Sequence, residues 1–236
     1  MNARLMAWRS LLHYRRTNVA VVLGVACAVA VLAGALLVGG SVRASLRAIS
    51  DARLGNAGAV ITAETFFREQ LAADLATGHP APGTRHIAPV VLLQGTVTHE
   101  ASGRRASRVA VYGVDDRFFA FHGAAVPAFV SGRSAGVSAA LAGELGAAAG
   151  DSLLVRVARP SDIPLESLHG RRDEGGRAIR ASMAGVLSAE GMGDFAVSAS
   201  QGAQRSIFLP LARLQRELAV AGRVNALLID AGPGAA

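Results

Sequence analysis

The chain has 236 residues, a net charge of +7 and a composition that is 51% hydrophobic but only 5% aromatic, so we expect a core of small aliphatic side chains. All 24 basic residues are arginine, which excludes the P-loop of an ATPase because its lysine reaches the phosphates. The arginines are not interleaved with stacking aromatics, which argues against a nucleic-acid-binding surface. Cys27 is the single cysteine, so no intrachain disulfide or cysteine metal site can form, and we expect a small packed hydrophobic side chain there.

The N-terminal segment, MNARLMAWRSLLHYRR, is predicted to be amphipathic. Leu5, Trp8, Leu11 and Leu12 share one helical face, and the arginines lie largely off it. A helix of this kind lies in the membrane interface, where Trp8 and Tyr14 would sit at the level of the lipid headgroups.

The next segment, from Val19 to Val38, is predicted to be a transmembrane helix. It is an uncharged run of 20 residues flanked by arginines, and about 20 apolar helical residues span the hydrocarbon core of a bilayer. A core helix of a soluble protein would carry a polar face, which this run lacks. A cleaved signal peptide is the alternative, with Ala33–Ala35 as its cleavage region, although signal-peptide apolar regions are usually about 7–15 residues long.

The charges around this run favour a cytoplasmic N-terminus under the positive-inside rule. Before the run lie Arg4, Arg9, Arg15 and Arg16 without an acid, and after it lie Arg43, Arg47 and Arg53 with Asp51. Small residues recur every four positions at Ala26, Ala30 and Gly34, a ridge that would let another membrane helix approach closely. The stretch Ser41–Leu54 is expected to continue the helix out of the bilayer.

Beyond this helix, the sequence predicts an α+β arrangement of several short strands with three or four helices. A strand is expected at GAVITA (58–63), then a helix in ETFFREQLAADLATG, where Phe66, Phe67, Leu71 and Leu75 have helical spacing and Gly78 is the stop, then a loop at HPAPGT. The run VVLLQGTVTHEASGRRASRVAVYGVD predicts a hairpin, and DDRFFAFHG predicts a short helix capped by Asp115 or Asp116.

The second half continues the same alternation of strands and helices. AGVSAALAGELGAAAGDSLLVRV predicts a strand, an alanine-rich helix and a strand, with a turn at Gly150-Asp151. The polar stretch RPSDIPLESLHGRRDEGGR is expected to be a mobile surface loop or a contact site. A strand pair is expected over Ile179–Ala189 and Arg205–Leu209, then a helix that begins at Pro210, a last strand at NALLID and a flexible tail.

No catalytic, cofactor-binding or metal-binding residues are predicted, and we expect that the chain is not an enzyme. The six histidines lack the spacing of a zinc site, and Asp115 and Asp116 are better explained as helix caps than as a metal pair. Ser138 lies in GVSAA rather than in a nucleophile elbow, and Glu144 and Asp151 are expected to be ordinary surface carboxylates. The histidines are His13, His79, His86, His99, His122 and His169.

Four stretches in this order resemble the N-terminal part of FtsX/MacB-like ABC transporter permeases, and the resemblance covers almost the whole chain. RSLLHYRR followed by VAVVLGVACAVAVLAGALLVGGSVRASL is similar to the first membrane helix of that family, running into an extracytoplasmic stalk. The stretches VYGVDDRFF, VSAALAGELGAAAGDSLLVRV and SIFLPLARLQRELAVAGRVNALLID are similar to recurring patterns of the family's extracytoplasmic domain.

The resemblance implies a permease subunit in the bacterial inner (plasma) membrane, with its main domain in the periplasm. A separate ABC ATPase and a second permease copy are the implied partners. The ATPase would drive motion of the extracytoplasmic domain for export, lipoprotein handling or activation of a partner. The implied organisation is a cytoplasmic amphipathic segment (1–17), a transmembrane helix (18–40), a stalk helix (41–56), a MacB-like periplasmic core domain (57–232) and a tail (233–236).

The sequence departs from the family in one respect. The family has at least three more membrane helices and a cytoplasmic coupling element between them, so we expect a fragment of a longer permease or the product of a truncated gene. The alternative function is a single-pass, membrane-anchored sensor or binding domain without transport activity. Nothing in the sequence names the substrate or fixes the oligomeric state.

Overall fold

The computed structural model describes residues 13–78, 86–158, 176–198 and 202–230. It consists of two compact units, Met1–Ile49 and Ser50–Ala236, and each is described by itself below. The predicted amphipathic segment lies mostly outside the described residues, as do the HPAPGT loop, most of the polar stretch from Arg159 to Arg177, and the tail.

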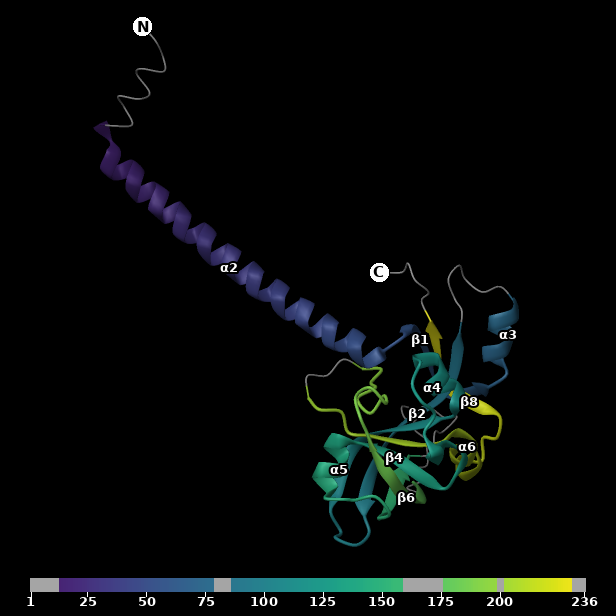
Figure 1. Cartoon of the computed structure of the whole chain (residues 1–236). Helices are drawn as coiled ribbons and strands as arrows, with labels where there is room; N and C mark the ends of the chain where they lie inside the picture. The colour runs from purple at the N-terminus through teal and green to yellow at the C-terminus, as the bar shows by residue number, and fades with distance from the viewer. Residues whose placement is uncertain (1–12, 79–85, 159–175, 199–201, 231–236) are drawn as a thin grey trace, which may run out of the picture. The chain divides into compact units, whose positions relative to one another are not determined.

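The α2 helix (Arg15–Leu54) is one uninterrupted helix of 40 residues, drawn in purple to blue in Figure 1. Its most apolar window has a mean hydropathy of 2.8, and none of its residues is buried. The helix is long and apolar enough to cross a membrane, and it is not a core helix. Its extent confirms the predicted continuation over Ser41–Leu54. Cys27 is exposed on this helix, and none of the described residues packs over it, so its expected packing stays a prediction.

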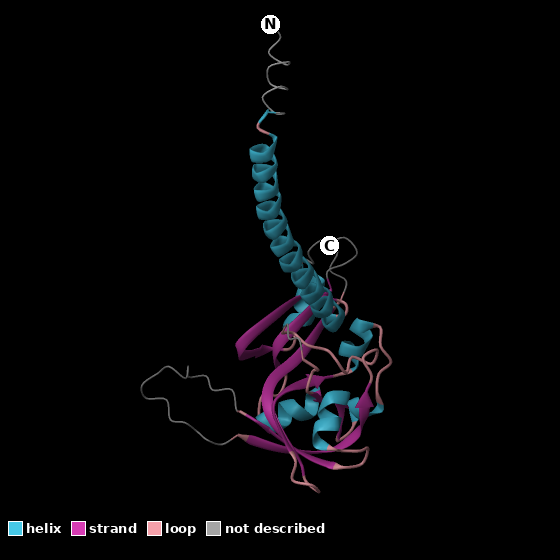
Figure 2. Cartoon of the chain, turned by 90° about the vertical axis from the view of Figure 1, so that its left-hand side faces the viewer, coloured by secondary structure: helices cyan, strands magenta, loops and turns pink. Residues whose placement is uncertain are grey.

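The second unit is an α+β domain, as the sequence predicts. Its strands curve strongly, and short helices pack against them (Figure 2). The elements, in chain order, are β1 (Ala57–Arg68), α3 (Leu71–Gly78), β2 (Ile87–His99), β3 (Arg105–Val114), α4 (Asp116–His122), the 3₁₀ helix η1 (Ala128–Ser131), β4 (Ser134–Ser138), α5 (Ala139–Leu145), β5 (Ser152–Val157), β6 (Arg177–Leu187), β7 (Ser206–Pro210), α6 (Leu211–Leu218) and β8 (Arg223–Asp230).

The eight strands form one sheet in the order β1-β8-β2-β3-β7-β4-β6-β5, and β2 also pairs with β5. This second pairing closes six of the strands, from β2 round to β5, into a ring. The long strand β2 joins the ring to the extension, because it pairs with β8 over Ile87–Val90 and with β5 over Gly95–His99. The last two strands, β8 and β1, therefore extend the sheet away from the closed ring.

Two predicted elements differ from the structure. The helix expected from Phe66 begins only at Leu71, because Phe66 and Phe67 belong to β1, where Phe67 pairs with Val224 of β8. Aromatic residues also favour strands, and this distant pairing outweighs their helical spacing. The strands β6 and β7 both exist but do not form a pair, because β4 lies between them, parallel to β6 and antiparallel to β7.

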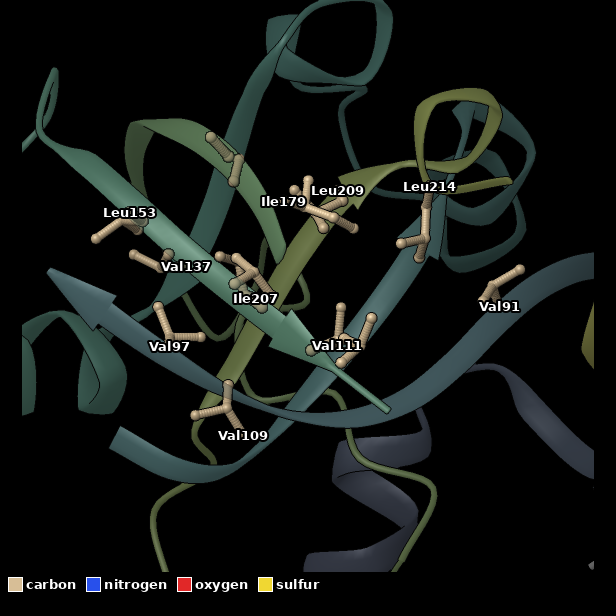
Figure 3. Close-up of a cluster of buried hydrophobic side chains, with 14 of the residues drawn as sticks. Val91, Val97, Val109, Val111, Val137, Leu153, Ile179, Ile207, Leu209 and Leu214 are labelled. Atoms are coloured by element: carbon tan, nitrogen blue, oxygen red, sulfur yellow. The ribbon is translucent and has the colours of Figure 1, made fainter. Parts of the chain in front are cut away.

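The ring encloses a core of small aliphatic side chains, as the composition predicts (Figure 3). Its valines, leucines and isoleucines alternate along the strands, which places every second side chain on the inner face. The members labelled in Figure 3 are Val91, Val97, Val109, Val111, Val137, Leu153, Ile179, Ile207, Leu209 and Leu214.

A second core, which composition does not predict, is aromatic. It collects six of the chain's eight phenylalanines around α4. These rings meet mostly edge to face, as between Phe118 and Phe195, whose centroids lie 5.1 Å apart at 84°. Leu54, the last residue of α2, packs against this cluster. The six are Phe118, Phe119, Phe121, Phe129, Phe195 and Phe208.

Candidate functional site

The polar residues singled out in the sequence mainly serve the fold. Asp115 caps α4 by accepting from the backbone N–H of Arg117 at 3.0 Å, as predicted. Ser138 is buried and its Oγ accepts from the backbone N–H groups of Leu141, at 3.3 Å, and Ser206, at 3.0 Å. It therefore joins the start of α5 to β7 and is not placed for nucleophilic chemistry.

The carboxylates and histidines are similarly dispersed. Asp151 accepts from the backbone N–H of Ala148 at 2.8 Å and lies 3.3 Å from Nε2 of the buried His99. Glu144 faces Arg205 at 3.4 Å. Within the part of the chain that the structure describes, no group of three or more histidine, cysteine, aspartate or glutamate residues could hold a metal ion. His79 and His169 lie outside the described residues.

The candidate site is the stalk junction, which we define as Leu54, Gly55 and Asn56 together with Phe121 and His122 at the end of α4. Gly55 ends α2 in the left-handed conformation, with φ of +59°, and its N–H donates to the carbonyl of Asp51 at 3.1 Å. Glycine adopts this conformation at little cost and is the usual residue after a helix end.

Asn56 attaches the chain to α4 through two hydrogen bonds. Its backbone N–H donates to Nδ1 of His122 at 3.3 Å, and its side-chain Nδ2 donates to the carbonyl of Phe121 at 3.0 Å. Gly55 fits against the ring of His122 because glycine has no side chain. A Cβ at this position would lie 2.7 Å from Nδ1 of His122. The helix end is thus held by specific contacts to one short helix.

His122 is held in an apolar environment that keeps it neutral. Its ring packs on Phe118, Phe121 and Phe195, with centroid distances of 4.8, 4.9 and 5.4 Å. Burial lowers the pKa of His122 from 6.5 to about 4, because the charged imidazolium loses solvation there. The neutral ring leaves Nδ1 free to accept from Asn56, whereas protonation would place a hydrogen on that nitrogen and break the contact.

Acid is therefore expected to loosen the stalk junction. Because the folded-state pKa of His122 lies below its unfolded value, its contribution to stability is complete above pH 6.5 and is lost as the pH falls toward 4. We expect a loss of at most about 3 kcal/mol, after allowance for the solvent access of this partly exposed ring. Urea unfolding of wild type and His122→Gln between these pH values measures it, and parallel pH profiles of the two proteins would contradict it.

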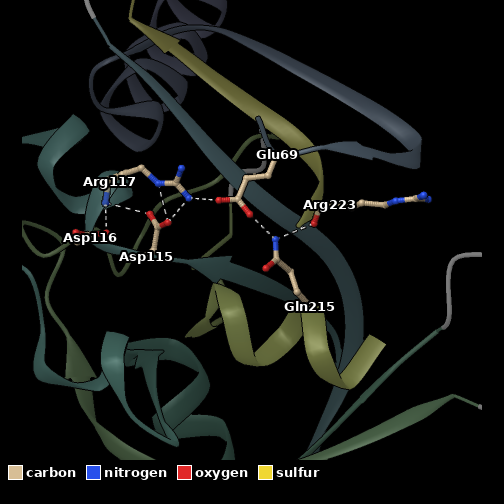
Figure 4. A network of polar contacts seen from close by, with 6 residues as sticks. All are labelled: Glu69, Asp115, Asp116, Arg117, Gln215 and Arg223. Atoms are coloured by element: carbon tan, nitrogen blue, oxygen red, sulfur yellow. Dashed lines mark hydrogen bonds and ion pairs between the residues drawn. The ribbon is translucent and has the colours of Figure 1, made fainter. Parts of the chain in front are cut away.

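The other end of α4 is fixed by a polar network (Figure 4). Arg117 pairs with both Asp115 and Glu69, the residue that follows β1. Gln215 of α6 donates to Glu69 at 2.7 Å and to the carbonyl of Arg223 at 3.0 Å. The network therefore links α4 to the end of β1, to α6 and to the start of β8.

The charges in this network are mutually stabilised. Burial acts to raise the pKa of Glu69, but hydrogen bonds from Gln215 and Arg117 outweigh it and lower that pKa. Burial acts to lower the pKa of Arg117, but its hydrogen bonds to Asp115 and Glu69 outweigh burial and raise that pKa. Both groups stay ionised near neutral pH, so α4 is held at one end by ion pairs and at the other by the stalk junction.

The sequence did not predict the hydrogen bond between Asn56 and His122. They lie 66 positions apart, and no local pattern connects them. The Gly55-Asn56 dipeptide was a usable signal, since glycine and asparagine are the residues that commonly follow a helix end.

No protein-family model and no curated protein matches this chain. Among solved structures, the periplasmic region of MacB from Actinobacillus actinomycetemcomitans is similar over 78% of this chain and 78% of that chain, with 9% identity and a TM-score of 0.47. The extracellular domain of the noncanonic ABC-type transporter YknZ from Gram-positive bacteria is similar over 75% of this chain and 83% of that chain, with 11% identity and a TM-score of 0.46.

Proposed function

We propose that the chain is the N-terminal portion of an ABC transporter permease of the FtsX/MacB type. The observation that carries the proposal is α2 with its junction. An apolar helix with no buried residue continues without a break to Leu54, and the next two residues are bonded to α4. Such a helix has the form of a mechanical connection between a bilayer and a folded domain.

The proposed mechanism is transmission of movement. A separate ATPase on the cytoplasmic side binds and hydrolyses ATP, which shifts the membrane helices. The stalk, over Ser41–Leu54, passes that shift to α4 through Asn56, and the network of Arg117, Glu69 and Gln215 passes it on to the sheet. Packed elements respond to such a push as rigid bodies.

The chain's own role is proposed to be non-enzymatic. It has no lysine and so no P-loop of its own, which assigns ATP hydrolysis to a partner subunit. The N-terminus is proposed to be cytoplasmic and the second unit extracytoplasmic, in the bacterial inner (plasma) membrane, with a second permease copy completing the complex. The moving domain would serve export, lipoprotein handling or activation of a partner.

Topology and partnership can be tested together on the full chain in its host membrane. In a Cys27→Ser background, we expect Ser107→Cys, an exposed position on β3, to react with a membrane-impermeant maleimide in intact spheroplasts. Asn2→Cys should react only after the membrane is opened. Affinity purification in mild detergent should recover an ABC ATPase with the chain.

Two results would contradict the proposal. Labelling of Asn2→Cys but not Ser107→Cys in intact spheroplasts would reverse the orientation. Correct labelling without any ATPase in the purified sample would favour the alternative of a single-pass, membrane-anchored sensor or binding domain.

A further inference from the structure

A groove of about 640 Å³ lies on the second unit, against β2 and β3, on the side that carries Gln94 and Ala110. Its volume is in the range of pockets that bind small ligands or short segments. The residues that line it come from β1, β2, β3 and β8 and from the chain around Arg205. They include two arginines, Arg108 and Arg205, and among the described residues that line it there is no carboxylate. Arg205 already faces Glu144, which lies outside the lining, at 3.4 Å.

Arg108 is held in an unusual conformation on the groove wall. Its φ is +54°, a left-handed value that costs energy in a residue with a side chain. The cause is a bulge in β3, where Gly95 pairs with Val109 but Val97 pairs with Ala106. Bulges re-aim side chains and are common beside binding sites. Arg108 is exposed, and within the described residues it makes no ion pair, so its guanidinium is available to an outside anion.

The groove also carries side-chain amides, which can pair with a peptide backbone because they hold both a donor and an acceptor. Asn225 already does this inside the protein. Its Nδ2 donates to the carbonyl of Leu92 at 2.8 Å, and its Oδ1 accepts from the N–H of Leu92 at 2.8 Å. Gln94 lies two residues further along β2 and is exposed, and its side chain makes no hydrogen bond to the described residues.

The lining of the groove also includes Thr62 and Ala63 of β1, at the start of an irregular stretch. Thr62 pairs with Ala226 and Phe67 with Val224, so the intervening residues 63–66 are out of the ladder with β8. Backbone groups outside a ladder are places where an extended segment can add hydrogen bonds.

We propose that this groove binds an extended acidic peptide segment. Arg108 binds one of its carboxylates, and Gln94 pairs with its backbone. Guanidinium–carboxylate contacts are strong and geometrically specific, and the side-chain amide of Gln94 favours a peptide over an acyl chain, which offers no hydrogen bonds. The proposal stands apart from the transport proposal, because it needs only the folded second unit and no ATPase.

The test is binding of a labelled probe peptide, acetyl-Ala-Glu-Ala-Glu-Ala-amide, to the full chain in detergent, followed by fluorescence anisotropy. Its matched control is the peptide with glutamine in place of both glutamates. We expect the acidic peptide to bind at least about tenfold more tightly, the scale of one charge-assisted contact. Arg108→Gln should weaken it by a similar factor, and Gln94→Ala should weaken both peptides. Arg105→Gln, which removes an exposed arginine outside the groove, should change neither.

Three results would overturn the proposal. The first is no binding of the acidic peptide to wild type up to about 1 mM, the range of weak specific complexes. The second is an equal loss of affinity in Arg108→Gln and Arg105→Gln, which would indicate general charge attraction. The third is displacement of the peptide by inorganic phosphate at equal concentration, which would show a simple anion site. None of these outcomes depends on whether the chain works with an ATPase.

Discussion

Replacing Gly55 with alanine is expected to lower the free energy of unfolding of the second unit by about 2–4 kcal/mol. Two costs combine in this estimate. The left-handed backbone disfavours any residue with a side chain, and the added Cβ would lie 2.7 Å from Nδ1 of His122. The ring would have to move, which breaks its contact with Asn56. Urea unfolding of the full chain, followed by far-UV circular dichroism, measures the loss.

Gly103→Ala is the matched control for this substitution. Gly103 has a φ of +69°, but nothing lies within 4 Å of the position that its Cβ would take. It should therefore show only the backbone cost, about 1 kcal/mol. If the two variants lose equal stability, the close contact between residue 55 and His122 contributes nothing to the free energy of unfolding. The stalk junction would then be looser than the structure indicates.

Replacing Ala44 with proline is expected to disconnect the stalk from the second unit. Proline in a helix interior removes a backbone hydrogen bond and clashes with the preceding turn, at a cost of about 3 kcal/mol or more. Ala44 is exposed on α2 and lies outside the core of the second unit. We therefore expect loss of any ATP-dependent change in the stalk junction, with the urea midpoint of the second unit unchanged.

The control for this variant is Ala44→Gln, since glutamine is a good helix former and keeps the helix continuous. The readout is hydrogen exchange of Leu54–Asn56 and α4 in the proposed complex with an ABC ATPase, measured in ATP and in ADP. A response in Ala44→Pro as large as that in Ala44→Gln would show that movement reaches the second unit by a route other than the stalk.

The parts of the fold that depend on neighbouring residues could be predicted. The long helix follows from its uncharged run. The cap of α4 follows from Asp115, which lies two residues before Arg117 and accepts a hydrogen bond from its backbone N–H. The hairpin of β2 and β3 follows from two β-rich runs around a short polar turn. In each case the physical cause lies within a few residues, so the sequence pattern contains it.

The parts that depend on distant pairing could not be predicted. Phe66 and Phe67 fit a helix by spacing and a strand by residue type, and only β8, far along the chain, decides between them. The closure of the ring depends on β2 meeting β5. The stalk junction likewise depends on a histidine whose burial comes from phenylalanines on several segments, such as Phe118 and Phe195.

The measurement that bears most directly on the proposed function is hydrogen exchange of the wild-type chain in the proposed membrane complex with an ABC ATPase. The amides to follow are those of Leu54–Asn56 and of α4, because Asn56 donates to His122 at the point where the stalk meets the domain. We expect their protection to differ between the ATP-bound and ADP-bound states of the complex. Identical protection in the two states, in a complex that hydrolyses ATP, would contradict transmission of movement through the stalk junction.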